Sequence, residues 1–295
     1  MIPIVFFHRG NQDYLKCALN RVERYNDVSY LIGDESNKTL CKNWYDINTL
    51  NGRFLEFKEK YIHMSTNSEE FELACFQRYF SLYELMKKCN LERAIMLDSD
   101  ILVTMSLGDL GIWSEKEVSF SVPLNQNEYE WVASPHVFYC TKNMLEKFTG
   151  YLLSAYTNQI SKLEEKYHYH KEHNLKGGIC DMTLLYLWSK EIEFLNLYDM
   201  SNYYFDHTMQ ERASFIWDKV LHMKKIRIKD GQMYLINADK KLIQPVVLHF
   251  QGSTKSIVKD LDSENSRIIM VLHRYFDLAL RIKNKCTQKI KRKKL

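Results

Sequence analysis

The stretch that most constrains the fold is the apolar run AIMLDSDILV, which spans Ala94–Val103. Only Asp98, Ser99 and Asp100 interrupt it, and a short run of this kind predicts a strand that is buried on both faces. Strands of that type are found in parallel sheets that helices cover on both sides. We therefore expect an open α/β sheet, in which ligands bind at the carboxyl ends of the strands.

Asp98 and Asp100 lie where this predicted strand ends. Two carboxylates two residues apart repel each other unless a positive charge neutralises them. A divalent cation that prefers oxygen ligands, Mg²⁺ or Mn²⁺, supplies that charge and would in turn hold the phosphates of a nucleotide. The local pattern alone also fits two acids in a surface turn, so both interpretations stay open here.

The remaining segments alternate between strand and helix patterns. Strands are predicted at Ile2–Phe7, Val28–Ile32, Phe54–Phe57, Val118–Val122, His136–Tyr139 and Pro245–Leu248, and helices at Asn11–Tyr25 and Lys142–Ala155. A hairpin is predicted at Ile226–Ile236 because Asp230-Gly231 is a strong turn signal. The alternation predicts βαβ units and a Rossmann-type, mixed but mainly parallel sheet that helices flank.

An acidic residue, Asp34, ends the second predicted strand. A carboxylate at that position often accepts hydrogen bonds from the hydroxyls of a ribose or from the donor group of a base. A role as a turn or capping residue is the alternative for Asp34.

Asn67–Lys88 is the clearest predicted helix, with Ser68 as its N-cap and acidic residues in its first turn. Arg78 falls in the middle of an apolar face that begins at Phe71. A buried guanidinium must find a partner, because an unpaired buried charge is costly. Two partners fit: a carboxylate in a structural ion pair, such as Asp98, or a phosphate of a bound donor.

Asp181 begins a helix that is predicted to run to about Trp188, directly after Gly177 and Gly178. The two glycines permit close approach of another backbone or of a ligand. Asp181 therefore has two candidate roles, one in an active site and one in satisfying the helix amides.

Three histidines, His168, His170 and His173, lie in the charged segment Leu163–Asn174. Their spacing follows no strict metal-ligand pattern. We therefore expect a solvated loop or helix end there, and a metal cluster is the alternative.

The last predicted strand is followed by HFQGSTK, from His249 to Lys255. An imidazole, a flexible glycine at Gly252 and a lysine at the end of a strand are suited to hold a metal and a phosphate. The motif is weak alone and becomes informative beside the two aspartates.

Composition is that of an ordinary soluble protein, with 45% hydrophobic and 26% charged residues. No apolar run reaches the length of a membrane span. The N-terminus is apolar but lacks a basic start and a small-residue cleavage site, so we expect a strand there and no signal peptide. Seven cysteines without a CxxC pair favour free thiols in a reducing, cytoplasmic compartment.

Positive charge is concentrated at the C-terminus. Residues 281–295 contain eight Lys or Arg and no acids. The rest of the chain has 33 basic and 37 acidic residues. This slightly acidic balance argues against a general nucleic-acid-binding surface. An amphipathic helix is predicted at 266–282. A polybasic segment of this kind is attracted to an anionic membrane, so we expect peripheral docking at the inner face of the cytoplasmic membrane, with a disordered solubilising tail as the alternative.

These residues together resemble the GT-A class of nucleotide-sugar-dependent glycosyltransferases. The likeness is carried by the start IPIVFFHRGN, by Asp98-Ser99-Asp100 after its strand, and by HFQGSTK, which is similar to the His-x-x-Gly-x-x-Lys element of the glycogenin-like retaining transferases. The segment FELACFQRYFSLYELM looks like bacterial polysaccharide and lipopolysaccharide glycosyltransferases, in which the arginine lies near the donor. We expect a glycosyltransferase domain at 1–260 and a helix with a basic tail at 261–295.

The resemblance implies transfer of a sugar from a nucleotide sugar, such as a UDP-sugar, to a saccharide or lipid-linked saccharide in surface polysaccharide synthesis. It implies retention of configuration, while inversion would need a carboxylate base such as Asp181. Mn²⁺ or Mg²⁺ would be held by Asp98, Asp100 and His249. The donor would contact His8, Asp34, Arg78, Asp98, Ser99, Gly252 and Lys255. Asp181 and Arg78 would be the catalytic residues.

Two other classes compete with this interpretation. Haloacid-dehalogenase-like phosphatases also place Asp-x-Asp after a buried strand, but that strand usually opens the fold, and here more than ninety residues precede it. Their later acidic pair is also missing, because Asp260 and Asp262 follow no apolar strand. A non-catalytic carbohydrate-binding protein would leave the inward Arg78 and the predicted metal ligands without a purpose.

Overall fold

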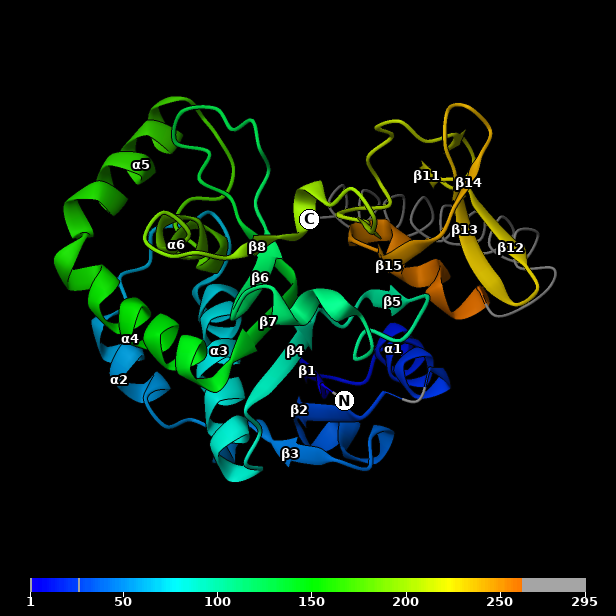
Figure 1. Cartoon of the computed structure of the whole chain (residues 1–295). Helices are drawn as coiled ribbons and strands as arrows, with labels where there is room; N and C mark the ends of the chain where they lie inside the picture. The colour runs from blue at the N-terminus through cyan, green and yellow to red at the C-terminus, as the bar shows by residue number, and fades with distance from the viewer. Residues whose placement is uncertain (1, 26, 262–295) are drawn as a thin grey trace, which may run out of the picture.

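The computed structural model describes residues 2–25 and 27–261, and its centre is a seven-stranded sheet (Figure 1). The strand order is β3-β2-β1-β4-β7-β6-β8, and β7 runs against the direction of the other six. The strands are β1 (Ile4–His8), β2 (Ser29–Gly33), β3 (Trp44–Asp46), β4 (Arg93–Leu97), β6 (Val118–Ser121), β7 (Ser134–Thr141) and β8 (Leu195–Asn196). The predicted mixed and mainly parallel sheet is therefore confirmed.

Helices cover both faces of this sheet because successive residues of its strands point to opposite sides. On β1, Ile4 and Phe6 belong to one apolar core, with α1, and Val5 belongs to the other. The helices are α1 (Asp13–Arg24), α2 (Phe54–Lys60), α3 (Glu69–Lys88), α4 (Lys142–Asn158), α5 (Ile160–Glu172) and α6 (Asp181–Trp188). Apolar side chains from α2 to α6 form the second core against the opposite face, which explains why the strands read as continuous apolar runs.

The run AIMLDSDILV forms two strands instead of one. After β4 the chain turns through Asp98–Asp100 and enters β5 (Ile101–Val103), which leaves the large sheet. β5 pairs antiparallel with β15 (Pro245–His249), so that Ile101 lies opposite His249, and β15 pairs parallel with β9 (Tyr204–Phe205). This small sheet brings the two aspartates next to a histidine that is distant in the sequence.

The part of the chain between β9 and β15 forms two further small sheets (Figure 1). They contain β10 (Trp217–Asp218) with β11 (Met223–Lys224), and β12 (Ile226–Lys229) with β13 (Gln232–Ile236) and β14 (Leu242–Ile243). The predicted hairpin is confirmed: β12 and β13 pair antiparallel around Asp230 and Gly231, which both have positive φ.

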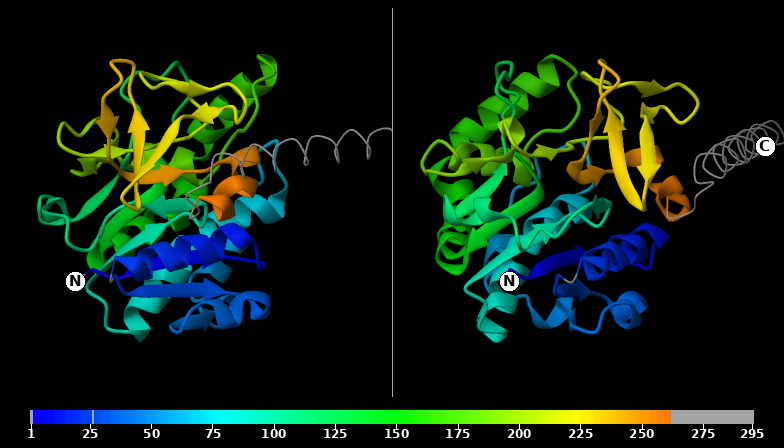
Figure 2. Two further views of the ribbon diagram at one scale, coloured as in Figure 1. Left: turned by 90° about the vertical axis from the view of Figure 1, so that its right-hand side faces the viewer. Right: turned by 45° about the vertical axis from the view of Figure 1, so that its right-hand side comes forward.

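In the described part of the chain, five 3₁₀ helices connect these elements. They are η1 (Glu35–Leu40), η2 (Ile47–Thr49), η3 (Gly111–Ser114), η4 (Leu197–Asp199) and η5 (Gly252–Asp260). η5 follows β15 directly and packs against α1 (Figure 2), which brings the end of the HFQGSTK motif beside the N-terminal βα unit.

The prediction of a strand at Phe54–Phe57 is wrong. These residues belong to helix α2, and the third strand is β3 at Trp44–Asp46. Phe54 and Phe57 are buried, whereas Leu55 and Glu56 between them are exposed, which is the spacing of one helical turn. A run this short does not distinguish a strand from a helix by periodicity.

Helix α3 begins as predicted, since the Ser68 hydroxyl accepts the backbone N–H of Phe71 at 3.3 Å. The predicted face is wrong at its start, however. Phe71 is 57% exposed, and the neighbouring Glu72 is buried. His168 and His170 lie in the C-terminal half of α5 and His173 is its C-cap, so they occupy a helix end, one of the two positions that were expected.

The predicted amphipathic helix at 266–282 and the basic tail lie outside the described residues, as does the predicted C-terminal segment apart from residue 261. Within residues 2–25 and 27–261, no helix combines the length and the apolar character needed to cross a membrane.

Candidate metal centre and pocket

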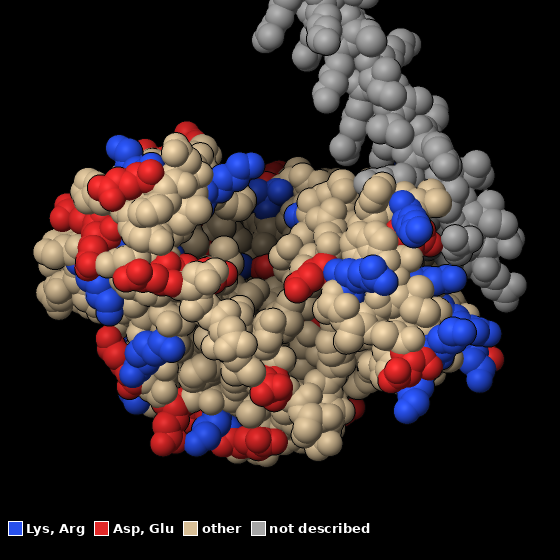
Figure 3. Space-filling view, turned by 90° about the horizontal axis from the view of Figure 1, so that it is seen from above, with Lys and Arg blue, Asp and Glu red and all other residues tan. Residues whose placement is uncertain are grey.

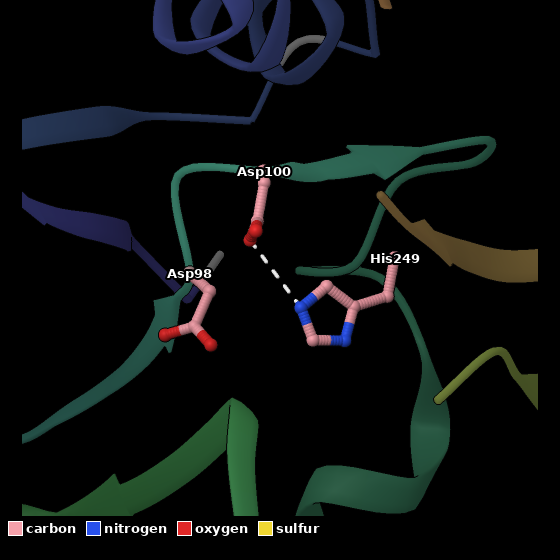
Figure 4. Close-up of side chains that lie close together, drawn as sticks. All are labelled: Asp98, Asp100 and His249. Atoms are coloured by element: carbon pink, nitrogen blue, oxygen red, sulfur yellow. Dashed lines mark ion pairs between the residues drawn. The ribbon is translucent and has the colours of Figure 1, made fainter. Parts of the chain in front are cut away.

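Three strand ends bring Asp98, Asp100 and His249 together (Figure 4). Asp98 follows β4, Asp100 precedes β5, and His249 ends β15. One ligand atom from each residue lies within 4.8 Å of the others, and the three side chains point into a common space. The structure thus brings together the three residues that were predicted as metal ligands.

The orientation of the His249 ring is fixed by a backbone carbonyl. Its Nδ1 lies 2.7 Å from the carbonyl oxygen of His207, and because a carbonyl only accepts, Nδ1 carries the proton and donates it. Nε2 then faces Asp100, with 3.3 Å between Nε2 and Asp100 Oδ1. An imidazole held in this way through one nitrogen offers the other one to a metal.

Asp100 is buried among positive charges. Lys255 Nζ lies 2.9 Å from Asp100 Oδ2, on the side away from His249. Burial by itself raises the pKa of Asp100, but His249 and Lys255 outweigh burial and hold that pKa below its usual range. In the same way, burial lowers the pKa of His249 and of Lys255, and Asp100 raises both above their usual values. Two carboxylates and one imidazole also form a donor set that Mn²⁺ or Mg²⁺ accepts.

Arg78 joins the candidate metal centre to Asp181. Its Nη1 lies 2.7 Å from Asp98 Oδ1, and its Nη2 pairs with Asp181 Oδ2, which also accepts the Tyr79 hydroxyl at 3.1 Å. Only 12% of the Arg78 side chain and 4% of the Asp181 side chain are exposed. The ion pair between Arg78 and Asp98 that was one of two alternatives is therefore present, and Asp181 is a second partner that the sequence did not assign to Arg78.

A pocket of about 410 Å³ opens over these residues. The residues predicted for the site that line this pocket are Arg78, Asp98, Ser99, Asp100, Asp181, His249, Gly252 and Lys255. In the space-filling view, this face is hollowed near its centre, with charged side chains of both signs in and around the hollow (Figure 3). The pocket thus collects most of the predicted site from five separate segments.

Within residues 2–25 and 27–261, the lining of this pocket does not include His8 or Asp34. Asp34 caps η1: it accepts the backbone N–H of Ser36 at 2.9 Å and that of Gly10 at 2.7 Å. The ring of His8 is hydrogen-bonded to Gln12. The capping role that was the alternative for Asp34 is therefore realised, and it ties the ends of β1 and β2 together.

Glu72 and Cys75 are among the pocket residues that the sequence analysis missed. Glu72 is buried, with Oε1 accepting from Ser65 at 2.6 Å and from Asn67 at 2.8 Å. Both precede Arg78 at intervals of three residues, so they share its face of α3. That spacing was the available sequence signal, but the acidic residues of this first turn were interpreted only as favourable at a helix N-terminus.

Gly178 permits a close backbone contact just before Asp181, as predicted. The Ile179 N–H donates to the Met64 carbonyl at 2.7 Å, and Ser65 forms a β-bridge with Gly178. A Cβ on Gly178 would lie 2.2 Å from the Met64 oxygen, and its φ of +140° suits glycine. The segment that leads into α6 is thereby held against the segment that leads into α3.

We expect Gly178→Ala to lower the free energy of unfolding by roughly 2 kcal/mol or more, because the new methyl group meets backbone that cannot move independently. Gly177→Ala is the matched control, since its φ is +88° but nothing lies within 4 Å of an added Cβ; strain alone should cost it about 1 kcal/mol. Urea denaturation of both variants measures the difference. Equal losses would contradict the importance of the Met64 contact.

No protein-family model matches the chain, and no curated protein is similar to it in sequence. Among solved structures, it is similar to an active-site mutant of LgtC, at 15% identity and TM-score 0.48 over 94% of this chain and 96% of that chain. It is also similar to the apo form of mouse xyloside xylosyltransferase 1, at 15% identity and TM-score 0.47 over 66% and 84% of the two chains. WbbM, described as a bifunctional glycosyltransferase, gives 12% identity and TM-score 0.46 over 92% of this chain and 51% of that chain. Similarity at this level does not transfer an activity, which depends on the site itself.

Proposed function

We propose that this protein is a metal-dependent glycosyltransferase that moves a sugar from a nucleotide sugar to a hydroxyl of a saccharide or lipid-linked saccharide. The observation that carries the proposal is the placement of Asp98, Asp100 and His249 beside Lys255 and Arg78 at one pocket. A UDP-sugar is the proposed donor, surface polysaccharide synthesis the proposed role, and retention the proposed stereochemistry.

Mn²⁺ or Mg²⁺ would be held by Asp98, Asp100 and His249. When bound, the cation supplies positive charge to the diphosphate that leaves as the glycosidic bond breaks. Both carboxylates lie close enough to share one ion, and the fixed ring of His249 presents Nε2 to the same space.

Lys255 is placed to meet the leaving diphosphate. About a third of its side chain is exposed, so its ammonium can turn from Asp100 toward a ligand in the pocket. Fixed positive groups stabilise charge that develops in the transition state. Gly252, with φ of +53°, lets the chain turn directly after β15 and leads Lys255 back over the pocket.

We assign the nucleoside end of the donor to the part of the site next to His8 and Asp34. A second pocket of about 480 Å³ shares Gly252 and Lys255 with the first one and is lined by Gln12, the hydrogen-bond partner of His8. The sugar is assigned to the opposite side of Lys255, where Arg78 holds the carboxylate of Asp181 at the pocket wall. Ser99 lines the first pocket and is assigned to donor binding there.

We expect Asp100→Asn and His249→Ala each to abolish the Mn²⁺-dependent stabilisation of the protein by UDP, because the first removes the negative charge of a ligand and the second removes the imidazole ligand. Ligand at one hundred times its Kd stabilises a native state by about 2.7 kcal/mol, which thermal unfolding with and without Mn²⁺ detects. Asp239→Asn and His222→Ala, at exposed positions, are the matched controls. Full Mn²⁺-dependent UDP binding by either site variant would show that its residue is not a ligand.

The other two classes give different results in one assay. A glycosyltransferase hydrolyses a UDP-sugar slowly in the presence of Mn²⁺ and does not hydrolyse a generic phosphate ester. A haloacid-dehalogenase-like phosphatase would show the reverse preference, and a non-catalytic carbohydrate-binding protein would turn over neither compound.

The basic segment 281–295 is proposed to dock the enzyme peripherally on an anionic membrane, where a lipid-linked acceptor would be presented. Each Lys or Arg near such a surface contributes about 1 kcal/mol, so eight of them suffice to hold a protein there. This proposal rests on the sequence, because the segment lies outside the described residues.

Truncation after Ile282 should release the protein from anionic liposomes while hydrolysis of the free donor continues unchanged. High salt should have the same effect on the full chain, because exposed charges are screened within about 10 Å at 0.1 M salt. Co-sedimentation of both forms at low and high salt measures this. Equal pelleting of the full and truncated chains would refute membrane docking by the tail.

A further inference from the structure

Behind the candidate metal centre lies a buried ion pair between Asp206 and Lys224. The exposed fractions of their side chains are 0% and 3%. Asp206 follows β9 and Lys224 ends β11, so the pair joins the small sheet that contains β15 to the neighbouring one. A buried ion pair is a poor source of stability, because desolvation offsets the attraction. Its contacts indicate a different role.

Asp206 holds the backbone of His249. Its Oδ2 accepts the backbone N–H of His249 at 3.1 Å, while its Oδ1 pairs with Lys224 and accepts the Tyr204 hydroxyl at 3.2 Å. This contact acts at the last residue of β15, where the chain leaves the strand.

Lys224 holds the chain on both sides of His207. Its ammonium donates to Asp206 Oδ1, to the Thr208 carbonyl at 3.0 Å and to the Tyr204 hydroxyl at 3.0 Å, so all three of its N–H groups have an acceptor. Residue 207 lies between two residues that Lys224 fixes. The His207 carbonyl is therefore held in position, and this is the carbonyl that accepts the Nδ1 proton of His249.

We propose that Asp206 is a positioning residue that sets the direction of His249 Nε2 toward Asp98 and Asp100, and that the ion pair with Lys224 makes burial of its carboxylate possible. Asp206 acts through its hydrogen bond to the backbone N–H of His249. Outer contacts of this kind change metal affinity by about 10- to 100-fold when they are removed. This inference rests on the proposed metal site.

The test compares three double variants, all of which remove the buried charges. Asp206→Asn with Lys224→Met keeps an oxygen that can accept the His249 N–H. Asp206→Leu with Lys224→Met removes this oxygen. Replacement of a buried ion pair by apolar residues often leaves stability unchanged. Asp206→Ala with Lys224→Met is a third variant that avoids overpacking by leucine.

Mn²⁺ affinity is measured in the presence of UDP from the loss of the paramagnetic resonance signal of free Mn²⁺, and thermal unfolding is recorded for every variant. We expect the Asn variant to bind Mn²⁺ within a few-fold of the wild type, and the Leu and Ala variants to bind it about 10- to 100-fold more weakly. These losses should appear in the folded protein, at temperatures well below each variant's Tm.

Wild-type Mn²⁺ affinity in the Leu or Ala variant would overturn the positioning role and leave the proposed metal site intact. An equal loss in the Asn, Leu and Ala variants would also overturn it, because the effect would then not depend on the hydrogen bond to His249. If the wild-type chain itself fails to bind Mn²⁺ with UDP, the metal site is refuted together with this inference.

Discussion

The repulsion between Asp98 and Asp100 is the interaction on which the rest of the site depends. Their placement on either side of one residue, between two buried strands, keeps two carboxylates close together where water cannot screen them fully. The protein surrounds them with side chains from three other elements: the cationic Arg78 from α3 and Lys255 from η5, and the imidazole of His249 from β15. The turn between β4 and β5 is therefore the point at which distant parts of the chain must meet.

This balance explains the arrangement of the surrounding elements. β5 leaves the large sheet and pairs with β15, which carries His249 to Asp100, and η5 then packs against α1 and carries Lys255 to the other side of the same carboxylate. On the opposite wall, Arg78 neutralises Asp98 and Asp181 together. The contact of Gly178 with Met64 holds the start of α6, so that Asp181 remains at the pocket.

The sequence predicted the parts of this arrangement that local patterns encode. Uninterrupted apolar runs predicted the buried strands. Asp98 and Asp100 were predicted as a cation site because two carboxylates two residues apart repel each other unless a positive charge neutralises them. Arg78 was identified because a charge on an apolar face must be neutralised. The strand predicted at Phe54–Phe57 was wrong, since four residues are too few to separate helical from strand periodicity.

Other features depend on tertiary contacts that no local pattern contains. Three features join segments that are far apart in the sequence. They are the pairing of β5 with β15 outside the large sheet, the ion pair of Arg78 with Asp181, and the ion pair of Asp206 with Lys224. Glu72 was interpreted only as an acid that suits the first turn of a helix, and it is buried at the pocket wall.

The central claim is that Asp98, Asp100 and His249 bind a divalent cation together with the diphosphate of a nucleotide. Its most direct test is anomalous diffraction from crystals of the protein grown with Mn²⁺ and UDP. The account predicts one strong anomalous peak about 2 Å from a carboxylate oxygen of each aspartate and from His249 Nε2, with the UDP phosphates beside it. UDP bound in the pocket without such a peak, or a peak on other residues, would contradict the account.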